Sequence, residues 1–177
     1  MSPPRPISIA EPAGVGSRRV ASAPSGRARV LVLGYGNPGR QDDGLGPAAA
    51  ARIETLGWSG VTAYDNYQLN IEDAVDVASH DVVWFVDASR AGPSPYAVTE
   101  LSSAPTLEFT SHLVRPEAIL ALAGQYYGRT PKAFLLAIRG YRFEFVEVLT
   151  PGARDNLKLA VAVLSDRIRQ AQSEVSP

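Results

Sequence analysis

The 177-residue chain contains no cysteine and only two histidines. The lack of cysteine excludes disulfides, thiolate zinc sites and a cysteine nucleophile, so any metal must be held by oxygen and imidazole ligands. A formal net charge of -1 and a pI near 6.1 give no sign of the basic face that nucleic acid or an anionic membrane attracts. No apolar run approaches the roughly 20 residues of a membrane span, and the N-terminus lacks the apolar core of a secretory signal. We therefore expect a cytoplasmic protein that binds neither nucleic acid nor a membrane.

Composition divides the chain into one folded domain and two short tails. Residues 1–28 are rich in proline, serine, glycine and arginine, a composition that cannot bury enough apolar surface to order itself. The remaining length fits a single domain with one well-buried core. We expect a disordered tail over 1–28, the folded domain over 29–172 and a flexible C-terminus over 173–177.

From Arg29 onward, apolar runs typical of strands alternate with helical patterns, which is the rhythm of βαβ units. Thr150 followed by Pro151 is typical of a helix N-terminus and precedes the clearest helical repeat. The pattern predicts a doubly wound α/β domain, hydrolase-like or phosphorylase-like, with a mostly parallel sheet and helices on both faces. The expected strands cover 30–33, 61–64, 82–86, 96–101 and 133–138, and the expected helices cover 48–56, 71–78, Pro116 to about Gly128, and the C-terminal segment after Pro151.

The most informative segment is VLVLGYGNPGRQDDGLGP, in which an apolar strand enters a glycine-rich loop that carries Asp42 and Asp43. In doubly wound sheets, ligands bind beyond the carboxyl ends of the strands, where such loops converge. Two adjacent carboxylates repel each other unless backbone donors or a cation offset their charge. We therefore interpret this loop as a candidate site.

A dinucleotide site is one interpretation of this loop. Gly34, Gly36 and Gly39 match G-x-G-x-x-G after a strand, and Asp65 ends the second strand about where a ribose-binding acid would lie. However, two prolines and two further glycines delay the helix whose N-terminus should meet the pyrophosphate. The carboxylates of the loop would also face the phosphates with like charge. A second interpretation is that the acids only cap the following helix, and Asp42 is the candidate for that supporting role.

A metal site is the third interpretation. Asp87 is the first polar residue after the apolar run 82–86, and a buried carboxylate there needs a partner or a cation. His112 lies in a polar stretch ahead of the Pro116 helix, where an imidazole would face the loop edge of the sheet. Asp43, Asp87 and His112 together suit a borderline divalent ion such as nickel or zinc. The other histidine, His80, is expected to be a solvent-facing loop residue.

Several segments resemble the hydrogenase maturation endopeptidases, which trim the C-terminal extension from the large subunit of nickel-iron hydrogenases. The opening signature of that family is similar to Gly34-Tyr35-Gly36-Asn37-Pro38 followed by Asp42-Asp43-Gly44 and Gly46. The resemblance extends over about residues 29–170. Three further segments carry it: Phe85-Val86-Asp87-Ala88, Ser111-His112 and Val148-Leu149-Thr150-Pro151.

This resemblance implies that Asp43, Asp87 and His112 contact a metal, the nickel already inserted in the hydrogenase precursor. It also implies that Gly36 and Asn37 shape the loop beside the metal and that Asp42 supports it. Metal-assisted hydrolysis, with one carboxylate as general base, is the reaction we expect. A nickel-sensing maturation scaffold without catalysis is the alternative. The segment Arg139-Gly140-Tyr141-Arg142-Phe143 matches no pattern that we can assign.

Overall fold

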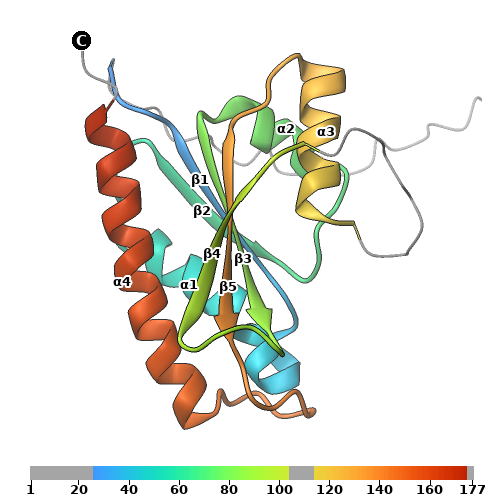
Figure 1. Ribbon diagram of the computed structural model, residues 1–177, viewed down its shortest axis with the longest axis vertical. Coiled ribbons are helices and arrows are strands. Elements are labelled where there is room, and N and C mark those ends of the chain that lie inside the picture. The colour runs from blue at the N-terminus through green and yellow to red at the C-terminus, as the bar shows by residue number, and fades with distance from the viewer. Residues whose placement is uncertain (1–25, 104–113, 175–177) are drawn as a thin grey trace, which may run out of the picture.

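The protein forms a three-layer α/β domain, seen in a computed structural model that describes residues 26–103 and 114–174 (Figure 1). A five-stranded sheet has the order β2-β1-β3-β5-β4, in which only β4 runs antiparallel to its neighbour. The doubly wound, mostly parallel fold expected from the sequence is confirmed. The elements are β1 (Val30–Tyr35), the 3-10 helix η1 (Pro38–Gly44), α1 (Leu45–Glu54), β2 (Val61–Asn66), α2 (Asp73–Ser79), β3 (Val82–Ser89), β4 (Tyr96–Leu101), α3 (Pro116–Tyr127), β5 (Lys132–Arg139) and α4 (Pro151–Glu174).

Two hydrophobic clusters lie on opposite faces of the sheet, because alternate residues of each strand point to opposite sides. Helices α1 and α4 cover one face, and α2 and α3 cover the other (Figure 1). On β1, Val30 and Val32 face the first pair of helices, whereas Leu31 and Leu33 face the second. All four side chains are fully buried, so β1 lies at the centre of the core and its C-terminal end is held rigidly.

The helix boundaries follow local signals in the sequence. Thr150 caps α4, since its hydroxyl accepts a hydrogen bond from the Ala153 amide at 3.3 Å and Pro151 begins the helix. Gly128 ends α3 in the left-handed conformation with φ 66°, which glycine adopts without strain. Both boundaries confirm the prediction. Among the described residues, no helix has an apolar stretch long enough to cross a membrane.

Strands β1 and β3 form the point at which the winding of the sheet reverses direction. The chain leaves β1 through α1 to reach β2 on one side, whereas β3 leads to β5 and β4 on the other. Helix α1 lies very close to this pair of strands, because a Cβ atom on Gly46 would lie 2.3 Å from the Tyr35 carbonyl oxygen and 2.5 Å from that of Val86. Doubly wound folds bind ligands at such a reversal point, and the loop after β1 lies beside it.

Candidate functional site

The loop after β1 holds Asp43 through its own backbone. Gly36 has φ 137° and lies so close to the loop that an added Cβ would be 2.1 Å from the Asp43 carbonyl oxygen. The amide of Asn37 donates to Asp43 Oδ2 at 3.1 Å, and the Asn37 side chain accepts from the Gly39 amide at 2.9 Å. Asn37 Nδ2 also donates to the Tyr67 hydroxyl at 2.6 Å. Gly36 and Asn37 therefore shape the loop around Asp43. Their expected position beside a metal stays a prediction.

Asp87 lies near the C-terminal end of β3, one residue beyond the pair that joins Gly34 of β1 to Val86. Its carboxylate accepts a hydrogen bond from the Ala88 amide at 2.7 Å and another from the Tyr35 hydroxyl. Burial, together with the negative charge of Asp43, raises the pKa of Asp87 to about 6. Asp43, in the loop after β1, and Asp87, on the neighbouring strand β3, lie beside the reversal point and interact electrostatically.

Tyr35 is a site residue that sequence reasoning did not select. Burial raises the pKa of its hydroxyl, and the adjacent Asp87 carboxylate raises it further, so the group stays protonated and donates to Asp87. Its only sequence signal is its position between two glycines, and its ring packs against the core on the α2 and α3 side of the sheet. Glu117, in the first turn of α3, also raises the pKa of Tyr35. The start of α3 is therefore close enough to the site to act on it through charge.

His112 lies outside the described residues, so its place beside the two aspartates stays a prediction. Within residues 26–103 and 114–174, no group of three or more acidic or histidine side chains is arranged to hold a metal ion. Two of the three predicted ligands are nevertheless brought together. Asp87 is half-buried and lies near the negative charge of Asp43, and the oxygen donors of this pair fit a divalent cation.

Asp42 has a different role from the helix cap that the sequence suggested. Helix α1 begins at Leu45, and its N-cap residue, Gly44, makes no side-chain capping hydrogen bond. The Asp42 carboxylate is fully buried and instead accepts four hydrogen bonds from distant segments. The donors are the amides of Tyr141, Arg142 and Thr150 and the Thr150 hydroxyl, at 2.8, 3.1, 2.8 and 2.8 Å respectively. These hydrogen bonds outweigh the effect of burial and lower the pKa of Asp42.

The same contacts explain the segment after β5 that matched no sequence pattern. Gly140 lies against Asp42, since an added Cβ would be 2.9 Å from Asp42 Cβ. The amides of the next two residues then point at the carboxylate. This segment therefore requires a glycine followed by two residues whose amides can donate to Asp42. No local sequence pattern reveals this requirement, because Asp42 lies about 100 residues earlier in the chain.

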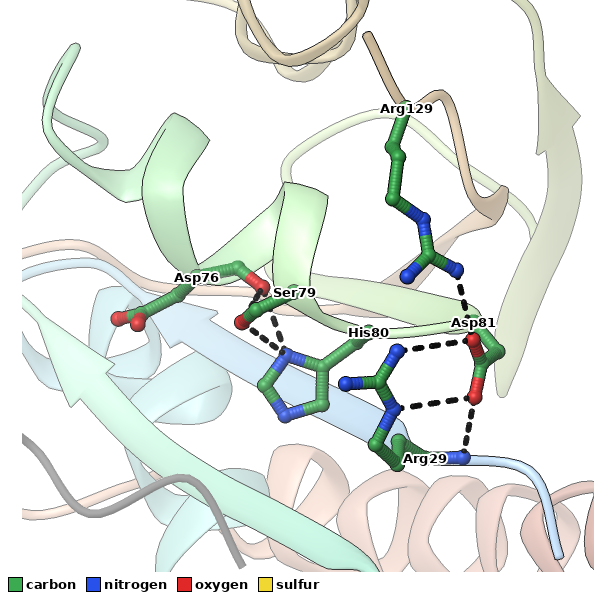
Figure 2. A network of polar contacts seen from close by, with 6 residues as sticks. All are labelled: Arg29, Asp76, Ser79, His80, Asp81 and Arg129. Atoms are coloured by element: carbon green, nitrogen blue, oxygen red, sulfur yellow. Dashed lines mark hydrogen bonds and ion pairs between the residues drawn. The ribbon is translucent and has the colours of Figure 1, made fainter. Parts of the chain in front are cut away.

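His80 lies at the opposite end of the strands from the candidate site. Its burial contradicts the predicted solvent-facing position. It is 1% exposed. Figure 2 shows its ring packed against the end of α2, where Nδ1 lies 2.6 Å from the Asp76 carbonyl oxygen. Nε2 lies 3.1 Å from Thr62 Oγ1 on β2. Burial lowers the pKa of His80, so the ring is neutral and ties α2 to the sheet far from the site.

The glycines that resembled a dinucleotide fingerprint serve the packing of the backbone. Gly34 admits the Gly46 carbonyl oxygen, to which an added Cβ would come within 2.2 Å, and Gly36 admits that of Asp43. After them, seven residues of 3-10 helix separate β1 from α1. The N-terminus of α1 therefore does not follow the glycines directly, as pyrophosphate binding requires. The dinucleotide interpretation loses its geometric support.

Comparisons with known proteins identify the fold. No family model matches the chain, and no curated protein matches its sequence. Among solved structures, the NiFe hydrogenase maturation protease HycI from Thermococcus kodakarensis superposes with a TM-score of 0.66 at 19% identity, over 82% of this chain and 95% of the other. The hydrogenase maturating endopeptidase HybD from E. coli gives 0.63 at 22% identity, over 80% and 93% of the two chains. The hydrogenase 2 maturation peptidase of a Thaumarchaeota archaeon gives 0.60 at 22% identity, over 79% and 97%. The chain therefore has the fold of the hydrogenase maturation proteases, and the resemblance seen in the sequence is confirmed at the level of the fold.

Proposed function

We propose that this protein is a nickel-dependent endopeptidase that removes the C-terminal extension of a nickel-iron hydrogenase large-subunit precursor after nickel insertion. One observation carries the proposal. On the fold shared with hydrogenase maturation proteases, Asp43 and Asp87 lie together at the reversal point of the sheet, where burial and, to a smaller extent, the charge of Asp43 raise the pKa of Asp87 to about 6. Two adjacent carboxylates at the ligand-binding edge of the sheet are suited to a cation. The cytoplasmic location expected from the sequence stays a prediction.

In this proposal Asp43 and Asp87 hold the nickel that arrives with the precursor, and His112 completes the set. Bound nickel would polarise the scissile carbonyl or lower the pKa of a water molecule. One of the two carboxylates would serve as the general base. The Tyr35 hydroxyl orients the Asp87 carboxylate by donating to it. Asn37 fixes Asp43 through its amide.

The direct test is the C-terminal mass of the host's large subunit, measured in cells that carry the wild-type protein or a variant of it. We expect the extension to be lost with the wild type and kept with Asp43→Asn, Asp87→Asn and His112→Ala. Asp65→Asn is the matched control, because Asp65 is an exposed aspartate at the end of the neighbouring strand β2. Loss of the extension with both aspartate variants would contradict the proposal. Precursor that is bound but never shortened would favour the nickel-sensing scaffold.

Nickel dependence has its own test. Precursor purified from nickel-starved cells is mixed with the wild-type protein before and after nickel is restored, and the mass of the large subunit is followed. The proposal expects cleavage only after nickel has been restored. Cleavage of the nickel-free precursor at the same rate would contradict the role of the metal and leave the peptidase assignment intact.

A further inference from the structure

The loop between β5 and α4 exposes an unusual amount of apolar surface next to the candidate site. We call residues 141–150 the docking loop. Phe145 is 84% exposed, Val148 60% and Tyr141 48%. Grouped apolar side chains that remain in water commonly mark an interaction surface. The loop lies at the C-terminal edge of the sheet, where the segment after β1 also lies (Figure 1).

A hollow of about 570 Å³ lies between the docking loop and the first turn of α4. Its apolar wall includes Val148, Leu149 and Pro151, and its charged lining residues are Arg142 and Arg154. Among the described residues, no acidic side chain lines it, although Glu144 and Glu147 belong to the same loop. The hollow therefore suits a group that is apolar on one side and carries a negative charge on the other.

The docking loop is tied to the segment that carries Asp43. The buried Asp42 carboxylate binds its first two amides and its last residue, as described above. The amide of Gln41 also donates to the Val146 carbonyl oxygen at 2.7 Å, and the Arg40 guanidinium lies 5.2 Å from the centre of the Phe145 ring. Among the described residues, Gln41 is the one residue other than glycine that has a positive φ, 54°. Such strain persists only where surrounding contacts enforce it.

These contacts give the docking loop a fixed position relative to Asp43 and Asp87. A surface that is ordered before binding loses less conformational entropy when a partner docks. Asp42 is therefore a positioning residue, since it joins the surface to the site and does not itself face the reacting atoms.

We propose that the docking loop and its hollow bind a segment of the hydrogenase precursor in which a carboxylate lies next to a large apolar side chain. The apolar side chain would pack on Phe145 and Val148, and the carboxylate would meet Arg142 and Arg154. Arginine suits this task because its planar guanidinium binds a carboxylate through two hydrogen bonds. The proposal rests on the proposed function and adds to it the surface by which the substrate is selected.

The test separates binding from catalysis by measuring KM and kcat for cleavage of the purified nickel-containing precursor. We expect Phe145→Ala and the double variant Arg142→Glu/Arg154→Glu to raise KM about tenfold, equivalent to ~1.4 kcal/mol of binding energy, with kcat changed less than about twofold. The matched controls are Tyr126→Ala, an aromatic residue 68% exposed at the far end of α3, and Arg167→Glu in the second half of α4. Both controls should behave as the wild type.

Salt provides a second readout of the charge contact. Affinity of the precursor for an inactive Asp87→Asn protein should fall between 50 and 300 mM salt, because exposed charges are screened. In an Arg142→Glu/Arg154→Glu background this dependence should be lost or reversed. Unchanged KM values and an unchanged salt dependence, in variants that cleave the precursor, would overturn the docking surface and leave the peptidase function standing. If the wild type leaves the precursor uncleaved, the proposed function fails and the docking surface fails with it.

Discussion

At the scale of single residues, Asp42 in the loop after β1 and Asp87 on β3 have opposite electrostatic environments. Four hydrogen-bond donors around Asp42 lower the pKa of its carboxyl, so this group is a permanently charged structural anchor. Asp87, which receives fewer donors and lies near the charge of Asp43, has a raised pKa. Their environments separate the structural carboxylate from the one at the candidate site.

Asp87→Asn should stabilise the protein at neutral pH. A carboxyl whose folded pKa is raised binds more protons in the folded state, so its contribution to stability falls as pH rises from about 4 to about 6 and is lost above that range. A shift of about two pKa units corresponds to at most about 3 kcal/mol. Urea unfolding should show the variant to be more stable than the wild type at pH 7.5 and the difference to shrink toward pH 4. An Asp65→Asn control should show no such trend, and equal stability of Asp87→Asn and wild type at pH 7.5 would contradict the prediction.

Asp42→Asn should destabilise the protein by about 2 to 4 kcal/mol, because an amide offers one acceptor oxygen where the carboxylate meets four donors. The loss should be seen in urea unfolding at pH 7 and should diminish as pH falls, since protonation of the wild-type carboxyl removes the same interactions. Asp166→Asn, an exposed aspartate on α4, is the control. A change below about 0.5 kcal/mol would show that the carboxylate is not the anchor of residues 141–150.

At the scale of elements, α1 can pack closely against β1 and β3 because Gly34 and Gly46 have no side chains. Gly46→Ala should cost about 2 to 3 kcal/mol, because the new methyl group would overlap backbone oxygens that cannot move without shifting the sheet. Gly124→Ala in α3 is the matched control, since its methyl group meets only the end of the Thr130 side chain and alanine favours a helix. Thermal and urea unfolding measure both, and an equal effect of the two substitutions would show that the close approach of α1 is unimportant.

The helices and strands could be predicted because each is a local pattern. The antiparallel strand β4 matches its predicted bounds, 96–101, and the Thr150-Pro151 pair marked the start of α4. The site was only partly predictable. Asp43 and Asp87 could be selected as polar residues that follow strands, because the carboxyl ends of parallel strands meet at one edge of the sheet. The helix-capping role suggested for Asp42 was wrong, because its four donors lie about 100 residues away and no short-range pattern reports them.

The sequence also did not allow us to predict which single polar residues would be buried. His80 follows α2 and precedes β3, where a histidine usually faces solvent, yet packing of α2 against β2 encloses its ring. Tyr35 shows the same limit, since its function depends on Asp87 of the neighbouring strand. Both residues acquire their roles from contacts between elements.

At the scale of the whole molecule, the two edges of the sheet serve different purposes. The C-terminal edge carries the candidate site, whereas the N-terminal edge is closed by polar contacts among segments distant in sequence (Figure 2). Arg29, at the start of β1, and Arg129, ahead of β5, both pair with Asp81 at 3.2 and 2.9 Å. The arginines lower the pKa of Asp81 against the opposing effect of burial. Since these pairs are partly exposed, each contributes only modestly to stability.

His80 should make the stability of the whole domain depend on pH near neutrality. Because burial lowers its folded pKa, the unfolded chain binds more protons, so the contribution of His80 to stability is lost as pH falls through the unfolded value of about 6.5. The charged groups around the ring are Asp76, Arg29 and Asp81, and both carboxylates oppose this shift. Asp87 acts in the reverse direction over the lower part of the same range, so the net pH profile of the wild type mixes two effects.

The separate contribution of His80 is measured with His80→Gln, which can still form a hydrogen bond at that position but does not titrate. The free energy of urea unfolding, determined from pH 8 to pH 5, should fall more steeply on acidification in the wild type than in the variant, by up to about 1.4 kcal/mol for each unit of pKa difference. Parallel profiles would mean that the ring is protonated as readily in the folded protein as in the unfolded chain. In that case the N-terminal edge would be held by the arginine contacts with Asp81, and the buried histidine would only fill space.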